Sequence, residues 1–139
     1  MPRATTSRRD LGLLVLGRGI GGMFVAHGLP KLTGGPARWH ALGENMRHLG
    51  VDFAPSVWGL AAALAEGLGG LCLAAGVAFR PAAAALTSTM IVAATSHLAK
   101  GDPFVKTSHS VEAGILFASL VLIGPGELRL RRRSGPRGD

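Results

Sequence analysis

Seven ionisable side chains lie within or at the ends of long apolar stretches of this chain. They are Arg18, His27, Lys31, Glu66, His97, His109 and Glu112. A charged group inside a lipid bilayer is costly unless it is paired or hydrated, so such residues mark functional sites more strongly than they do in water. Their imidazole, ammonium and carboxyl groups can donate hydrogen bonds to a bound ligand or exchange protons.

Arg18 and Glu66 are expected to lie near the middle of a membrane. At a helical rise of 1.5 Å per residue, Arg18 is about seven residues from the inner end of its apolar stretch, and Glu66 is about ten residues from the outer end of the next one. We therefore predict an intramembrane ion pair between them. Such a pair either takes part in the chemistry or only fixes the register of two helices.

The other five side chains are predicted to form one polar cluster at the outer ends of the helices. These residues are His27, Lys31, His97, His109 and Glu112. Lys31 follows His27 by four residues, so the two share a helix face, whereas Arg18 and His27 lie on opposite faces. Either helix tilt accommodates both, or one of them faces an adjacent subunit of a homo-oligomer. The alternative for the histidines is plain hydration at the membrane interface. A metal site built from His27, His97, His109 and Glu112 is a further alternative, since the ligand types are suitable, but no short ligand spacing identifies a metal and none is expected.

Four apolar stretches must position these groups. They span residues 11–29, 57–79, 81–99 and 108–124. Each is close to the roughly 20 residues that a helix needs to cross a bilayer. The sequence therefore predicts an all-α, integral membrane bundle of four transmembrane helices over 11–127, between basic tails at 1–10 and 128–139.

The extended outer loop between the first two predicted spans, residues 30–56, carries apolar residues at helical spacing. Trp39, Leu42, Met46 and Leu49 recur among polar side chains. This pattern fits an amphipathic helix at the membrane interface. A partly ordered polar loop is the alternative.

The net charge of +7 is concentrated in arginines at both ends of the chain. Basic residues that flank apolar spans set membrane topology, and their excess on the side of the termini predicts that both termini are cytoplasmic. This layout argues against nucleic acid as the partner. Ser7, Arg8 and Arg9 resemble a twin-arginine signal, but the first apolar stretch has no convincing cleavage site, so we expect it to remain in place. The single cysteine, Cys72, excludes an internal disulfide or a dithiol redox pair.

Three motifs resemble the DoxX family in their order along the chain. They are His-Gly-x-x-Lys at 27–31, Glu-x-x-Gly-Gly at 66–70 and Gly-Pro-Gly at 124–126. The resemblance covers residues 11 to 127 and implies a four-helix protein of the bacterial plasma membrane that is associated with oxidoreductase systems. Relatives include a subunit of a thiosulfate:quinone oxidoreductase and members of complexes with sulfurtransferase and superoxide dismutase partners. The chain departs from the family after Gly126, where Glu127 and Leu128 lead into arginines.

We therefore expect a membrane subunit of an electron-transfer system whose polar interior receives a quinone head group. His27, Lys31 and His97 could supply hydrogen-bond donors to the quinone carbonyls. No motif for a resident flavin or haem is visible, and whether the subunit is itself catalytic stays open. The alternatives are a non-catalytic anchor or assembly partner for a soluble redox enzyme, of the sulfurtransferase or dehydrogenase type, and a proton or small-solute conduit.

Overall fold

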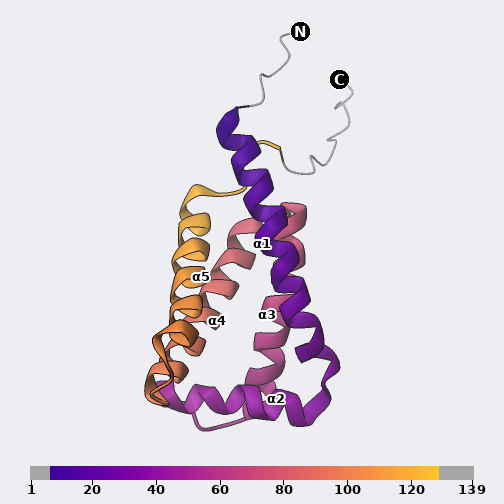
Figure 1. Cartoon of the computed structure of the whole chain (residues 1–139). Helices are drawn as coiled ribbons and strands as arrows, with labels where there is room; N and C mark the ends of the chain where they lie inside the picture. The colour runs from indigo at the N-terminus through magenta and orange to yellow at the C-terminus, as the bar shows by residue number, and fades with distance from the viewer. Residues whose placement is uncertain (1–6, 129–139) are drawn as a thin grey trace.

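The computed structural model describes residues 7–128, and every regular element in that part of the chain is a helix (Figure 1). The elements are α1 (Arg8–Thr33), α2 (Gly35–Gly43), the 3₁₀-helix η1 (Glu44–Leu49), α3 (Pro55–Ala75), α4 (Phe79–Ala99) and α5 (Phe104–Ile123). Four long helices run along the length of the molecule, and α2 crosses one end of it, which we call the α2 end (Figure 1). The predicted all-α fold is confirmed.

Within residues 7–128, three helices are long and apolar enough to cross a membrane, namely α1, α3 and α4. The fourth long helix, α5, has 20 residues and packs against α4. Between α1 and α3, the predicted extended loop is largely helical, because α2 and η1 occupy most of it. This agrees with the helical spacing of Trp39, Leu42 and Met46.

Local sequence explains where the helices begin and end. The Ser7 hydroxyl accepts a hydrogen bond from the Arg9 amide at 3.1 Å and caps α1. Gly76 takes a left-handed conformation, with φ of 70°, and ends α3. The second and third apolar stretches were divided at residue 80, whereas the turn between the helices lies earlier and α4 already begins at Phe79.

Glycines allow α1 and α3 to touch backbone to backbone. A Cβ atom on Gly21 would lie 2.5 Å from the Gly70 carbonyl oxygen, and one on Gly28 would collide with the backbone of Gly67. Such close approach gives helices in a membrane their packing energy, since lipid supplies no hydrophobic drive between them. The two helices are therefore closely packed on the side of α3 next to Glu66.

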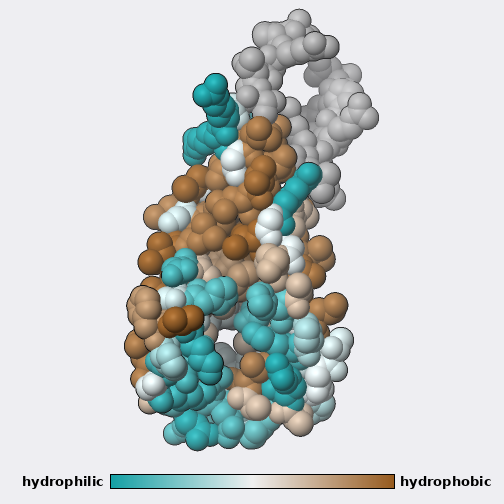
Figure 2. Space-filling model, in the orientation of Figure 1, coloured by the Kyte–Doolittle hydropathy of each residue, from teal (hydrophilic) through white to brown (hydrophobic). Residues whose placement is uncertain are grey.

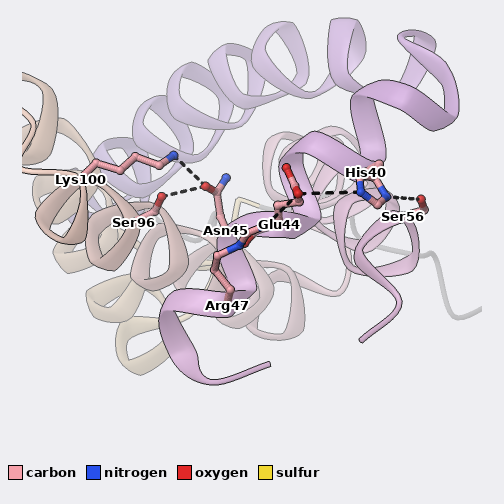
Figure 3. A network of polar contacts seen from close by, with 7 residues as sticks. All are labelled: His40, Glu44, Asn45, Arg47, Ser56, Ser96 and Lys100. Carbon is pink, nitrogen blue, oxygen red and sulfur yellow. Dashed lines mark hydrogen bonds and ion pairs between the residues drawn. The ribbon is translucent and has the colours of Figure 1, made fainter. Parts of the chain in front are cut away.

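The α2 helix is fixed across the α2 end in the same way. A Cβ atom on Gly43 would collide with the backbone of Pro55, and one on Gly59 would collide with that of Trp39. Polar contacts add to this packing (Figure 3). The Asn45 side-chain oxygen of η1 accepts hydrogen bonds from Ser96 Oγ at 2.8 Å and Lys100 Nζ at 3.0 Å, both in the segment that ends α4.

The hydrophobic core lies toward the other end of the bundle. Its buried members are Leu13, Phe24, Leu73, Phe79, Ala83, Leu86, Met90, Ala113, Phe117 and Leu120. Phe24 and Phe117 meet edge to face, with ring centroids 4.7 Å apart, and so join α1 to α5. On the face in Figure 2, hydrophobic residues gather over this half and hydrophilic residues over the α2 end. The two described ends of the chain meet away from α2, where the Glu127 amide donates to Asp10 Oδ1 at 3.0 Å.

Candidate functional site: a cavity between α3 and α4

The most deeply placed charge in the described chain is Glu66, and its partner is Lys31. Lys31 Nζ lies 2.5 Å from Glu66 Oε2, with the lysine side chain 25% and the glutamate side chain 6% exposed. The predicted Arg18–Glu66 pair is therefore wrong. Arg18 is exposed and makes no hydrogen bond or ion pair within residues 7–128.

The register of α1 against α3 explains this exchange of partners. Gly28 lies opposite Gly67, whereas Gly17 lies opposite Leu73. Arg18 is consequently level with the end of α3, more than one helical turn away from Glu66. Side chains on a helix lean toward its N-terminus, so Lys31, in the last turn of α1, reaches back to the level of Gly28 and meets the carboxylate.

The Lys31–Glu66 pair forms part of the wall of a cavity of about 320 Å³ between α3 and α4, covered at the α2 end by α2 and η1. The lining residues are Lys31, Leu42, Gly43, Asn45, Met46, Trp58, Ala61, Ala62, Ala65, Glu66, Ala85, Ser88, Thr89, Val92 and Ala93. Five alanines make the space, because they leave room that larger side chains would fill. A cavity of this volume is in the range of small-molecule sites.

Most of the cavity wall is apolar, including parts of it that look polar in the sequence. The Ser88 hydroxyl donates to the Ala84 carbonyl at 3.1 Å, and that of Thr89 donates to the Leu86 carbonyl at 2.8 Å. Both hydroxyls are thus satisfied by their own helix. The other lining residues with polar side-chain groups are Lys31, Glu66, Asn45 and Trp58.

Trp58 contributes a donor that has no acceptor. Its indole Nε1 is buried and is the one buried side-chain nitrogen or oxygen without a hydrogen-bond partner in the described residues. Leaving such a donor unsatisfied costs about 1–3 kcal/mol. Trp39 shows the contrast, since its indole N–H donates to the Lys31 carbonyl oxygen at 3.0 Å.

The sequence reasoning missed Trp58, although a signal for it exists. Trp58, Ala62 and Ala65 recur at i, i+4 and i+7, so they share one helix face that leads toward Glu66. A tryptophan followed by two alanines, on a helix face that leads to a buried carboxylate, indicates an unfilled space beside that face with the tryptophan at one end. Asn45 was missed because it lies in the segment assigned to an outer loop.

The predicted outer polar cluster is not a single site, because its members lie in separate places. Only Lys31 lines the cavity. The His27 and His109 rings lie 6.2 Å apart between α1 and α5, both exposed. Glu112 is exposed and has no hydrogen bond or ion pair within residues 7–128.

His97, the remaining member of that predicted cluster, is engaged locally at the end of α4. Its Nδ1 lies 2.7 Å from Asp102 Oδ2 in the connection to α5. The hydrogen bond from His97 holds the pKa of the Asp102 carboxyl below its ordinary value, and Lys106 also contributes. This contact fixes the turn between α4 and α5 rather than contributing to the cavity.

Over residues 7–128, no three or more His, Cys, Asp or Glu side chains come close enough together to hold a metal ion. The cavity is distinguished instead by the polar groups of its lining residues. Its lining residues carry one ammonium group, one buried carboxylate and one indole N–H without a partner, in an apolar surround. Such a site suits a neutral, flat ligand that carries hydrogen-bond acceptors.

Residues 12–99 match the family model described as DoxX. The matched segment contains every residue that lines the cavity, from Lys31 to Ala93. No curated protein and no solved structure matches the chain.

Proposed function

Since the chain belongs to the DoxX family of membrane proteins, we propose that it is a membrane subunit of a quinone-linked electron-transfer system. In this proposal, the cavity between α3 and α4 binds the quinone head group. The electrons come from a soluble redox partner.

The proposal places four helices across the bacterial plasma membrane, with α5 as the fourth span. Its 20 residues are enough to cross a hydrocarbon core at 1.5 Å per residue. An even number of spans also agrees with the meeting of Asp10 and Glu127 at one end of the bundle. The excess of basic residues toward that end supports cytoplasmic termini.

The observation that carries the proposal is the unpartnered Trp58 N–H in the wall that also holds the Lys31 ammonium group. A quinone is a flat apolar ring with carbonyl oxygens, and each oxygen accepts hydrogen bonds. A donor from Trp58 and one from Lys31 match that pattern, while the alanines of α3 and α4 accept the ring. Of the three donors expected from the sequence, Lys31 is the one at this cavity.

Reduction of a quinone adds two electrons and two protons to its oxygens. An ammonium group near a carbonyl oxygen favours the negative charge that develops there. Lys31 can also hand a proton to that oxygen and be reprotonated through Glu66, its partner at 2.5 Å. In this reading, the pair has a chemical role in addition to holding α1 against α3.

The proposal is tested by binding of a soluble quinone, menadione, to the purified full-length protein in lipid nanodiscs. Trp58→Phe keeps an aromatic ring but removes the N–H, and it should weaken binding about five- to tenfold, the value of one hydrogen bond of about 1–1.5 kcal/mol. Glu112→Gln is the matched control, because Glu112 is exposed and does not line the cavity. Wild-type affinity in Trp58→Phe, or no binding by the wild type, would overturn the proposal.

Experiments on the same nanodisc preparation distinguish quinone binding from the alternative that the protein is a non-catalytic anchor. A protein that binds no quinone but co-purifies with a soluble sulfurtransferase or dehydrogenase, unchanged by Trp58→Phe, is an assembly partner. Quinone reduction should also be measured with and without such a partner, because the electron donor is not part of this chain.

A further inference from the structure

The cavity has exposed lining residues on one side. Of its lining residues, all within the described chain, the two that are exposed are Ala61 of α3 and Ser88 of α4. The remaining lining residues are buried or half-buried. The mouth therefore lies between these two helices and is bordered by small side chains.

Other elements border the cavity on its remaining sides. At the α2 end, α2 and η1 cover the cavity and are held by the contact of Gly43 with Pro55 and by the hydrogen bonds of Asn45. Away from α2, the helices come together again, since a Cβ atom on Gly69 would lie 3.5 Å from Leu86 Cγ. Toward α1, the wall is formed by the Lys31–Glu66 pair.

The mouth faces the side of the bundle, in the middle of the helices. Ser88 is nine residues into α4, or about 14 Å along a helix of 21 residues. Ala61 shares a face of α3 with Leu64 and Leu68, and Ser88 shares a face of α4 with Ile91. These three apolar side chains are 44%, 56% and 53% exposed, which is the surface that lipid chains cover on a membrane helix.

We propose that the ligand enters this cavity sideways from the bilayer, through a portal between α3 and α4 at Ala61 and Ser88, and that the physiological ligand is a quinone with a long isoprenoid tail. This inference rests on the proposed quinone site. The ring occupies the cavity beside Trp58 and Lys31, and the tail passes between the two helices into the lipid. A water-soluble quinone fills the same site without using the portal as a tail exit.

The substitutions Ala61→Phe and Ser88→Phe test the portal from two different helices. Both positions are exposed, so a larger side chain fills the mouth without entering the packed core. Each should weaken binding of a tailed quinone in nanodiscs by about tenfold or more, equivalent to losing the contacts of roughly two methylene groups. Menadione, which has no tail, should lose clearly less affinity than the tailed quinone in each variant, so the readout is the ratio of the two losses, each tenfold loss being equivalent to about 1.4 kcal/mol.

Leu68→Phe is the matched control, because Leu68 lies on the same exposed face but does not line the cavity. A tailed quinone that binds both portal variants as tightly as the wild type overturns the portal and leaves the quinone site standing. Equal loss of tailed and tail-less quinone in both variants also overturns it, because the mouth would then not be separable from the ring site. A wild type that binds neither ligand overturns the proposed function itself.

A photoreactive group placed on the quinone tail gives a second readout that does not depend on substitutions. Labelling should fall on the exposed faces of α3 and α4 that carry Leu64 and Ile91. Labelling confined to α1 and α5 would overturn the portal, even where binding is tight.

Discussion

At the residue scale, the Lys31–Glu66 ion pair is the feature from which the site is built. A carboxylate that is 6% exposed would be strongly destabilised if it stood alone, and the ammonium group at 2.5 Å offsets part of that penalty. Lysine suits this position because its long flexible stem can reach back from the last turn of α1. The same flexibility leaves its ammonium group able to contact a ligand in the cavity.

The pair makes a prediction about stability. Lys31→Met leaves Glu66 buried without a cation, which should lower the free energy of unfolding by about 3 kcal/mol, at the low end for buried pairs because Lys31 is partly exposed. The double variant Lys31→Met with Glu66→Leu should recover most of this loss, since no unpaired charge remains. Thermal unfolding in detergent measures both.

Arg18→Met is the control for this prediction. Arg18 is exposed and unpaired within the described residues, so its loss should change the unfolding free energy by less than about 0.5 kcal/mol. A destabilisation by Arg18→Met as large as that by Lys31→Met would mean that Arg18 is the partner of Glu66 after all.

At the element scale, the crossing of α1 and α3 sets the position of the site. Gly21 and Gly28 of α1 press on Gly70 and Gly67 of α3, so the two helices have essentially one register in which their backbones fit. A shift by one turn would place side chains where only glycine is accommodated. The glycines thereby decide which cation meets Glu66.

The backbone-to-backbone crossing of α1 and α3 predicts opposite outcomes for two glycines of α1. Gly28→Ala should lower the unfolding free energy by about 1–3 kcal/mol, because its Cβ would meet backbone atoms that cannot move aside. It should also weaken menadione binding, since the helices that carry Lys31 and Glu66 must separate. Gly22→Ala should be neutral or stabilising, because a Cβ there meets nothing within 4 Å and alanine favours the helix. Equal effects of the two substitutions in detergent melts would show that the crossing is not backbone to backbone.

At the scale of the whole molecule, the two ends of the bundle differ in character. One end carries α2, η1 and their polar network (Figures 1 and 3). The other carries the arginine-rich start of α1 and the meeting of Asp10 with Glu127. The proposed orientation puts the α2 end on the outer side, with α2 along the membrane interface. The quinone site would then lie below an outer helical cover.

A reporter enzyme that is active only outside the cytoplasm tests this orientation. Fused after residue 139, it should be inactive. Inserted at Gly50, it should be active, and the fold should tolerate it because Gly50 is exposed, ends η1 in a left-handed conformation and has open space around it. The reverse pattern would contradict the orientation but would leave the bundle and the cavity unaffected.

Several features were determined by the sequence alone, because they depend on composition and local period. Stretches of about 20 apolar residues predict membrane helices, and the spacing of Trp39, Leu42 and Met46 predicts the helical cover. Small residues at spacing four, such as Gly17 and Gly21, predict a close helix crossing. The ordered motifs placed the chain in its family, which the match over residues 12–99 confirms.

Only the tertiary structure decided which polar groups meet. The depth estimate for Glu66 considered each helix separately. In the structure, glycines of both helices set the register of α1 on α3. Lys31 then reaches Glu66 because its side chain points back toward the start of α1. The members of the predicted outer cluster also lie in separate places. His97, for example, pairs with Asp102 in the connection that follows α4, and not with the other members. The cavity is a space between α3 and α4 that no side chain fills. It forms because alanines of both helices line it, and the pattern within one helix does not specify which face of the other helix it meets.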